Sequence, residues 1–358
     1  MREGWEYKTI ENCTSIEYGT RVVQKRDGGT IYPVYGGGGE TFRMDRYNRE
    51  DCLIIARFAM SPRCVRYVAG KFFLNDSGLS VKSKEELEQA YLNYHLLFFN
   101  DVIYHLGKGA AQRNLDVKAF RQLVIAIPPK PTQLSIVSEL DKLNELIQIK
   151  KEQLKDYDTL AQSIFYEMFG DPVENEKGWE VKKLGEVSTY PKERIAINQI
   201  CPNQYIGVEN LIKDRGGVRF SDNLPKADVA IAYKENDILL GNIRPYLKKI
   251  WLADKVGGAS GDVVIIRIKE RSISPLFLFK LLSSDQFFEY DNTHTKGAKM
   301  PRGDRKIIAK FGVILPPLSL QQSFAHKIEQ IERQKAEVQK TITDLETLLA
   351  ARMQYWFD

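Results

Sequence analysis

The sequence predicts a mixed α/β protein, in which two similar globular domains are separated by two long antiparallel coiled-coil helices and related by an approximate two-fold axis. Three observations predict this fold class. The segment Gly4-Trp5-Glu6 recurs as Gly178-Trp179-Glu180, and the pair Pro128-Pro129 recurs 188 residues later as Pro316-Pro317. After each Pro-Pro pair, apolar residues recur at alternating steps of four and three, which is typical of a coiled-coil helix. The chain therefore contains an internal repeat, and each half ends in a long helix.

The length and composition fit this division. A chain of 358 residues, with 43% hydrophobic and 28% charged residues, is long enough for two globular cores. We assign residues 1–129 to the first domain, 130–171 to the central helix, 172–317 to the second domain and 318–358 to the C-terminal helix.

The two predicted helices share one register. Adding 188 to each position of the first apolar seam gives the second seam, although Lys150, Lys335 and Arg352 interrupt the pattern. From Ile136 to Met168 the first seam spans 33 residues, so we expect a helix about 50 Å long. A domain of about 130 residues is too small to cover such a helix, so packing of the helices on each other is favoured over packing on their own domains. The apolar seam residues are Ile136, Leu140, Leu143, Ile147 and Leu154, and Phe324, Ile328, Ile331, Val338, Ile342 and Leu345.

The globular parts combine short apolar runs with amphipathic segments. We expect buried strands at residues 51–56 and 123–127 and, in the second half, at 237–241 and 311–315. Helices are expected at residues 91–99 and 275–282.

No motif for catalysis is evident. The proline pairs lack the acidic or amide residue that an amino-methyltransferase loop places before them, and there is no P-loop lysine motif. The run Gly36–Gly39 lacks the spacing of a nucleotide-binding loop, so it predicts a flexible turn whose backbone can approach DNA closely. We therefore predict no catalytic residues in this chain.

Histidines and cysteines suggest no metal site. His95, His105, His294 and His326 have no accompanying nucleophile or carboxylate constellation, and we expect structural or phosphate-neighbouring roles. The cysteines Cys13, Cys52, Cys64 and Cys201 lack CxxC pairing, which predicts reduced and mostly buried thiols. No leader or membrane span is recognisable, so a cytoplasmic protein is expected.

Basic, glycine-containing loops recur in both halves. They span residues 57–63 and 107–114 in the first half, and 241–249 and 295–302 in the second. The positive charge is concentrated in the globular parts, since residues 1–129 contain 18 basic and 15 acidic side chains and residues 241–310 contain 14 and 7.

Such loops suit DNA, because Lys and Arg neutralise phosphates while Arg, Asn and Gln can bind base edges. For any single side chain a solvated surface charge is the ordinary alternative, but the pairing of loops across the halves favours DNA. The predicted DNA-binding residues are Arg57, Arg63, Lys108, Gln112, Arg113, Asn242, Arg244, Lys248, Lys296, Lys299 and Arg302.

Taken together, the whole chain resembles the specificity subunit of type I restriction-modification systems. The resemblance rests on the Gly-Trp-Glu opening of each half and on a strand that ends in Pro-Pro followed by Gln, as at Pro316-Pro317 with Gln321, and more loosely at Pro128-Pro129 with Gln133. The helix end Gln162–Asp171 is also similar to that family.

This resemblance implies a non-catalytic subunit with two target-recognition domains, each of which recognises one half of a bipartite site in double-stranded DNA. The helices would set the unread spacing and bind two methyltransferase subunits, which carry S-adenosylmethionine, and restriction subunits would join the full complex. Two alternatives remain: a DNA-modifying or DNA-cleaving enzyme with an unrecognised active site, and a helical scaffold with no DNA role.

Overall fold

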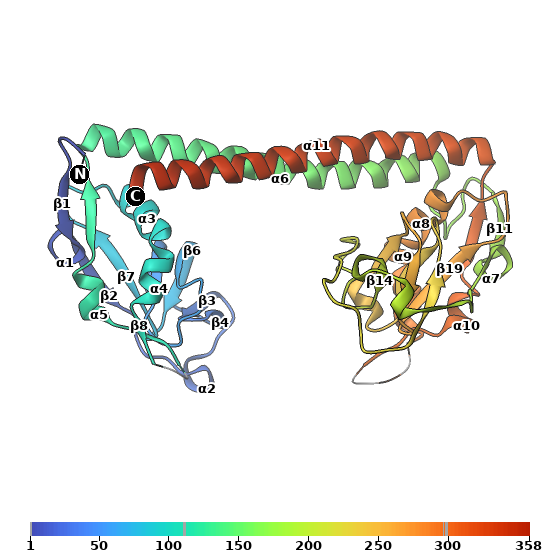
Figure 1. Cartoon of the computed structure of the whole chain (residues 1–358), viewed down its shortest axis with the longest axis horizontal. Coiled ribbons are helices and arrows are strands. Elements are labelled where there is room, and N and C mark those ends of the chain that lie inside the picture. Colours follow the sequence, from blue (N-terminus) through green and yellow to red (C-terminus); the bar gives the residue numbers. More distant parts are fainter. Residues whose placement is uncertain (1, 110–111, 296, 298–299) are drawn as a thin grey trace. The chain divides into compact units, whose positions relative to one another are not determined.

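A computed structural model describes residues 2–109, 112–295, 297 and 300–358. The chain divides into two compact units (Figure 1): unit 1 comprises Met1–Gln153 and Val338–Asp358, and unit 2 comprises Leu154–Glu337. Each unit holds one globular region and part of each of two 40-residue helices, α6 (Lys130–Phe169) and α11 (Leu318–Phe357). The predicted mixed α/β class, with two globular parts and two long helices, is confirmed.

The globular part of unit 1 is built on a six-stranded sheet in the order β2-β7-β5-β6-β3-β4. All neighbours are antiparallel except β3 and β6, which run parallel. The strands are β2 (Thr14–Tyr18), β3 (Tyr32–Gly36), β4 (Gly39–Met44), β5 (Arg49–Ala56), β6 (Val65–Leu74) and β7 (Gly78–Ser83). Two short pairs join β1 (Glu6–Thr9) to β10 (Val124–Ile127) and β8 (Gly107–Lys108) to β9 (Asn114–Leu115). The helices are α1 (Ile10–Cys13), α2 (Gln24–Asp27), α3 (Gln89–Phe98), α4 (Asn100–His105) and α5 (Val117–Arg121).

The globular part of unit 2 contains two four-stranded sheets, in the orders β12-β19-β16-β17 and β13-β15-β18-β14. The first consists of β12 (Ser188–Thr189), β16 (Ile238–Gly241), β17 (Ile250–Leu252) and β19 (Val263–Ile268). The second consists of β13 (Arg194–Ala196), β14 (Tyr205–Ile206), β15 (Val229–Tyr233) and β18 (Gly257–Ala259). A separate pair joins β11 (Glu180–Lys183) to β20 (Gly312–Leu315), and the helices are α7 (Leu184–Val187), α8 (Pro275–Leu282), α9 (Asp285–Thr293) and α10 (Arg305–Ile308).

The two units share the elements that frame each repeat. In each, the strand after Gly-Trp pairs antiparallel with the strand before Pro-Pro, as β1 with β10 and β11 with β20. In each unit a hydroxyl group binds the first carbonyl of the short helix that follows this first strand. The Thr14 hydroxyl donates to the Ile10 carbonyl of α1 at 2.6 Å, and the Ser188 hydroxyl donates to the Leu184 carbonyl of α7 at 2.7 Å. The sequence repeat is therefore a structural repeat at the boundaries of each unit, while the sheets between them differ.

Within each unit α6 and α11 run antiparallel. In unit 1, Lys151 Nζ lies 2.7 Å from Glu346 Oε1, and Arg352 pairs with Glu139. In unit 2, Lys335 Nζ lies 2.7 Å from Asp158 Oδ1. Of the apolar seam residues, Leu143, Leu154 and Leu345 are half-buried, and the rest are buried: Ile136, Leu140, Ile147, Phe324, Ile328, Ile331, Val338 and Ile342.

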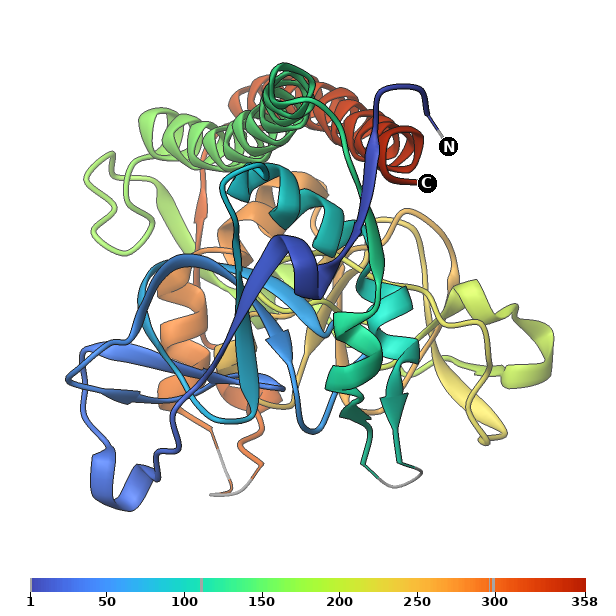
Figure 2. The same ribbon diagram turned by 90° about the vertical axis from the view of Figure 1, so that its left-hand side faces the viewer.

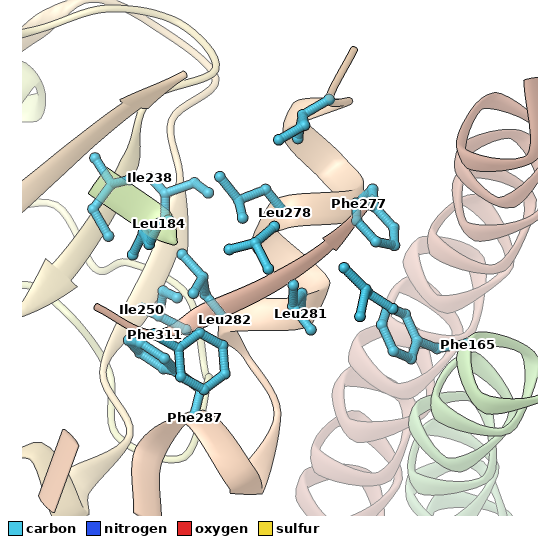
Figure 3. Close-up of a cluster of buried hydrophobic side chains, with 14 of the residues drawn as sticks. Phe165, Leu184, Ile238, Ile250, Phe277, Leu278, Leu281, Leu282, Phe287 and Phe311 are labelled. Atoms are coloured by element: carbon cyan, nitrogen blue, oxygen red, sulfur yellow. The ribbon is translucent and has the colours of Figure 1, made fainter. Parts of the chain in front are cut away.

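The helices also complete the core of each unit. In unit 1, Ile136 and Leu140 of α6 and Phe357 of α11 join the cluster around α3. In unit 2, Phe165 packs against Phe277 of α8 with ring centroids 5.9 Å apart (Figure 3). Phe165 lies outside the predicted seam, because here the apolar face of α6 contacts α8 as well as α11. Among the described residues, no helix is both long and apolar enough to cross a membrane.

Candidate nucleic-acid interface

In unit 1 the two predicted basic loops form one surface. The Met60 amide donates to the Arg113 carbonyl at 2.9 Å, and the Leu115 amide donates to the Arg57 carbonyl at 2.8 Å. The Ala59 amide also donates to Asn114 Oδ1 at 3.2 Å. In Figures 1 and 2 the β8–β9 pair, which carries the second loop, lies at the end of unit 1 remote from α6 and α11.

The arginines of this surface are stacked on aromatic rings. The guanidinium of Arg57 lies 4.9 Å from the ring centroid of Tyr18 and 4.5 Å from that of Phe58. The guanidinium of Arg113 lies 4.7 Å from the ring centroid of Tyr104. A cation over a ring face is attracted by the ring quadrupole, so these contacts restrict the arginine side chains.

The other predicted DNA-binding residues of unit 1 are more exposed to solvent. Lys108 Nζ lies 2.6 Å from Asp116 Oδ2, and this contact holds the pKa of the Asp116 carboxyl below its usual value. Arg63 and Gln112 are exposed. An exposed ion pair such as Lys108–Asp116 contributes little to stability, so a phosphate can replace the carboxylate at small cost.

The glycine run forms the turn of the β3–β4 hairpin, and Gly37 in it lies close to another loop of this chain. A Cβ atom on Gly37 would lie 2.0 Å from the Phe58 carbonyl oxygen. The Gly37 amide also donates to Ser77 Oγ at 3.1 Å. Glycine is therefore required because the turn packs on the 57–63 loop and helps to position Arg57 and Phe58.

In unit 2 the corresponding loops are joined in the same way. The Arg244 amide donates to the Pro301 carbonyl at 2.8 Å, and the Gly303 amide donates to the Asn242 carbonyl at 3.1 Å. Ile243 and Arg302 form an isolated antiparallel bridge. Each unit therefore brings its two basic loops together. Lys296 and Lys299, with Ala298, lie outside the described residues, as do Ala110 and Ala111 of the unit 1 loop.

Of the three predicted DNA-binding cations that the structure describes in unit 2, Lys248 and Arg302 are paired with carboxylates. Lys248 Nζ lies 2.5 Å from Asp285 Oδ1, and Arg215 binds the same oxygen. These contacts, that of Lys248 first, hold the pKa of Asp285 below its usual value. Arg302 lies 3.2 Å from Asp262 Oδ1, while Arg244 is exposed.

Asn242 points its side-chain oxygen into unit 2. Among the described residues, Asn242 Oδ1 and Asp291 Oδ2 are buried without a hydrogen-bond partner. A Cβ atom on Gly303 would lie 3.0 Å from Asn242 Oδ1 and 2.7 Å from Asp291 Oδ1, so these oxygens converge beside the loop. Burial raises the pKa of Asp291 to about 6. The side-chain oxygen of Asn242, a predicted DNA-binding residue, is thus buried inside unit 2 and not exposed at the surface.

The histidines have structural surroundings. His105 is the last residue of α4 and His294 follows α9, and each Nδ1 lies within hydrogen-bond distance of the carbonyl four residues earlier, at 2.6 and 2.7 Å. His95 is fully buried against aromatic rings, and burial lowers its pKa to about 3. Within the described part of the chain, no three His, Cys, Asp or Glu residues are grouped as metal ligands.

The cysteines are free thiols. Cys13 and Cys64 are buried and Cys52 is half-buried, whereas Cys201 is exposed and is the exception among thiols expected to be mostly buried.

The comparison with protein families decides the identity of the fold. A family model described as the type I restriction modification DNA specificity domain matches residues 2–156 and 176–347. The chain belongs to this family. The two matched segments begin close to the two Gly-Trp-Glu repeats, so each repeat corresponds to one copy of the specificity domain.

Relatives and solved structures agree with the specificity family. The type I restriction enzyme MjaVIII specificity subunit of Methanocaldococcus jannaschii is 24% identical over 78% of this chain and 75% of its own length. A putative type I restriction enzyme specificity subunit of Haemophilus influenzae is 28% identical over 39% of this chain and 38% of its own length. The crystal structure of the type I restriction-modification S subunit from M. genitalium aligns with a TM-score of 0.57 at 14% identity, over 99% of this chain and 96% of that one. A chain from a structure of type I R-M complex assembly and conformational transition aligns with a TM-score of 0.58 at 15% identity, over 99% and 97%.

Sequence analysis of this specificity-family chain missed several residues of the two surfaces. Tyr18 and Tyr104 were not among the predicted residues, although Phe58, adjacent to Arg57 in the sequence, was a usable signal for a contact between an arginine and a ring. Arg215 lies in a turn outside the repeated loops, with φ of 62°, and reaches them because its amide donates to the Lys248 carbonyl at 2.9 Å. No sequence pattern indicated this long-range contact.

Proposed function

We propose that this chain is the DNA-recognising specificity subunit of a type I restriction-modification complex, and that each unit recognises one half of a bipartite site. The proposed target-recognition domains are residues 1–129 and 172–317. The observation that carries the proposal is the joining, in each unit of a specificity-family chain, of two basic loops into one surface. Arginine, lysine and glutamine side chains on such surfaces suit phosphates and base edges.

The partners follow from the same proposal. Helices α6 and α11 would set the distance between the half-sites and bind two methyltransferase subunits, and restriction subunits would join the full complex. Methylation and cleavage would be carried by these partners, with S-adenosylmethionine bound by the methyltransferase subunit, and this chain would itself be non-catalytic.

Methylation mapping tests the proposal directly. Single-molecule sequencing would locate modified adenines in cells that express the cognate methyltransferase subunit, with and without this chain. A bipartite motif that disappears when this chain is omitted is the expected result. Methylation that persists without the chain, or a motif that is not bipartite, would contradict the proposal, and the purified chain would then be assayed for methyltransferase and nuclease activity.

A further inference from the structure

We propose that Arg57 and Arg113 are specificity-determining residues that bind guanine bases in the half-site recognised by unit 1. This inference rests on the proposed DNA-recognising function and deepens it, because it separates base-reading side chains from those that bind phosphates. Four structural observations support it: the stacking of each arginine, the space left for the Arg113 stem, the free hydrogen-bond donors, and the rigidity of the joined loops.

Arg57 contacts two aromatic rings at the surface. Its guanidinium carbon lies over the Tyr18 ring, 4.9 Å from the centroid, and over the Phe58 ring, 4.5 Å from the centroid, and these residues are 43% and 36% exposed. The stacked group is therefore half-buried at the surface rather than enclosed in the core. Stacking on the ring faces leaves the N–H groups at the edge of the guanidinium plane available.

Arg113 is positioned by both its ring contact and its aliphatic stem. The guanidinium lies over Tyr104 at 4.7 Å, and Nη1 lies 3.5 Å from the Tyr104 carbonyl oxygen. A Cβ atom on Gly107 would lie 2.4 Å from Arg113 Cγ, so only glycine at this position leaves room for the stem. The side chain is thus fixed along its length before any ligand binds.

Among the described residues, the donors of Arg57, and those of Arg113 other than the Nη1 donor directed at the Tyr104 carbonyl, remain available for a ligand. Among the described residues, neither guanidinium forms an ion pair with a carboxylate, and the Arg57 side chain has no hydrogen-bond partner. By contrast, Lys108 in the same loop is paired with Asp116, and Arg215 and Arg302 of unit 2 are paired with Asp285 and Asp262. Arg57 and Arg113 thus differ from these cations in two ways: their guanidinium groups are held against aromatic rings, and no carboxylate uses their hydrogen-bond donors.

These properties match guanine better than phosphate. A planar guanidinium binds O6 and N7 of guanine through two parallel hydrogen bonds, and this geometry is lost when the side chain is mobile. Ordering a free arginine side chain costs conformational entropy, and stacking lowers that cost before binding. The backbone hydrogen bonds of 2.9 and 2.8 Å between the loops hold the two arginines on one surface.

Charge-preserving variants test the inference in the assembled methyltransferase complex. Arg57→Lys and Arg113→Lys keep the positive charge but remove the planar pair of donors. We expect each variant to relax the motif at one G·C position of one half-site, with a loss of discrimination of roughly 5- to 150-fold, and to leave the other half-site unchanged. Arg26→Lys and Arg43→Lys, at exposed arginines of unit 1 outside the two basic loops, are the matched controls, and both are expected to retain the complete motif.

Methylation maps of the wild-type chain and these variants distinguish the outcomes. The inference is overturned if the wild-type motif has no G·C pair in either half, if Arg57→Lys and Arg113→Lys leave the motif unchanged, or if they weaken methylation equally at all sequences, which indicates phosphate contacts. Failure of the proposed function is distinct, because methylation would then be independent of the chain. Thermal unfolding of each purified variant identifies a loss of fold, and the two arginines provide independent tests.

Discussion

Two buried side-chain oxygens in unit 2, from Asn242 and Asp291, lie beside Gly303. Asp291 is only 2% exposed, and Asn242 Oδ1 is a second acceptor nearby, so an ionised carboxylate here faces another acceptor instead of a donor. Burial is the main reason that the pKa of Asp291 rises to about 6, and the charge of His294 acts in the opposite direction. The neutral carboxyl is therefore the form that suits this site, because it can donate a hydrogen bond.

The variant Asp291→Asn is expected to be more stable than the wild type above pH 6. The folded-state pKa is raised, so the contribution of the neutral carboxyl is fully present below about pH 4 and is lost as the pH rises through about 6. An amide keeps the neutral form at every pH, and the gain at pH 7.5 should be on the order of 2 kcal/mol. Thermal unfolding between pH 4.5 and pH 8 measures this difference.

The exposed Asp222 supplies a control for the loss of one negative charge. Asp222→Asn should change the midpoint little and without this pH dependence. A difference between Asp291→Asn and the wild type that is the same at pH 4.5 and pH 8 would show that the ionisation of Asp291 does not govern the effect.

Lys108 allows a phosphate contact to be separated from a base contact. Its exposed pair with Asp116 can be exchanged for a phosphate, which releases a counterion from DNA. Lys108→Ala should therefore weaken binding of all DNA sequences by the same factor and reduce the salt slope of log affinity by about 1. Binding titrations of the complex between about 50 and 200 mM salt give this slope. A changed base preference in Lys108→Ala would refute the phosphate role.

For individual residues, the sequence predicted where the basic loops lie but not which contacts each side chain makes. The spacing of 188 residues between Gly109 and Gly297 located equivalent loops in the two halves. It could not indicate that Asp285 binds Lys248, since that contact depends on where α9 begins in space. Nor could it distinguish a stacked Arg57 from a solvated one, because Tyr18 is distant in sequence.

Among the secondary-structure elements, one buried glutamine fastens the start of each long helix to its unit. The Gln133 side chain accepts from the Glu88 amide at 2.8 Å and donates to the Pro128 carbonyl at 2.8 Å. In unit 2, Gln321 accepts from the Ser274 amide at 2.8 Å and donates to the Pro316 carbonyl at 2.8 Å. Each amide thereby links a long helix, the preceding Pro-Pro segment and the start of α3 or α8.

Replacement of this glutamine should destabilise the unit. Gln321→Ala leaves the Ser274 amide and the Pro316 and Ser272 carbonyls without their buried partner. The expected loss in the free energy of unfolding is roughly 2–4 kcal/mol, since each orphaned group costs about 1–3 kcal/mol. Equilibrium chemical denaturation of the full chain provides the measurement. The neighbouring Gln322 is exposed, so Gln322→Ala should change the free energy of unfolding little. Equal losses of stability in the two variants would show that the hydrogen bonds of Gln321 do not stabilise the start of α11.

The helices were more predictable than the sheets. The heptad pattern identified both seams, because coiled-coil packing depends on residues close in sequence. It did not include Phe165 or Phe169, whose burial requires contact with Phe277 of α8 at ring distances of 5.9 and 4.8 Å. The runs that predicted β5 and β16 located single strands correctly, but strand order depends on pairing between distant segments, which periodicity does not specify.

The duplication of the whole chain has a consequence for the proposed DNA site. Both Gly-Trp-Glu segments begin a globular region and both Pro-Pro pairs precede a 40-residue helix, so the two halves contribute the same framework. Between these boundaries the sheets differ, with one six-stranded sheet and the β8–β9 pair in unit 1 and two four-stranded sheets in unit 2. Shared boundaries with different interiors suit two recognition domains that bind different half-sites through one common helical framework.

This framework predicts the effect of shortening both helices by one heptad. Deletion of residues 151–157 and 338–344 keeps the antiparallel seam in register and removes about 10.5 Å of helix. At 3.4 Å per base pair, the unread spacer should shorten by about three base pairs. Three base pairs also turn DNA by nearly a third of a helical turn, whereas a heptad changes the helix phase by only about 20°, so weaker binding is expected as well.

Methylation mapping of the shortened chain should therefore recover the same two half-sites at a smaller separation and with a lower methylated fraction. Deletion from one helix alone is the control, because it displaces the seam on one side and should abolish the shortened motif. If the double deletion retains the original separation, the distance between the half-sites is set by the globular regions or by the methyltransferase subunits. The helices would then hold the complex together without determining the spacer length.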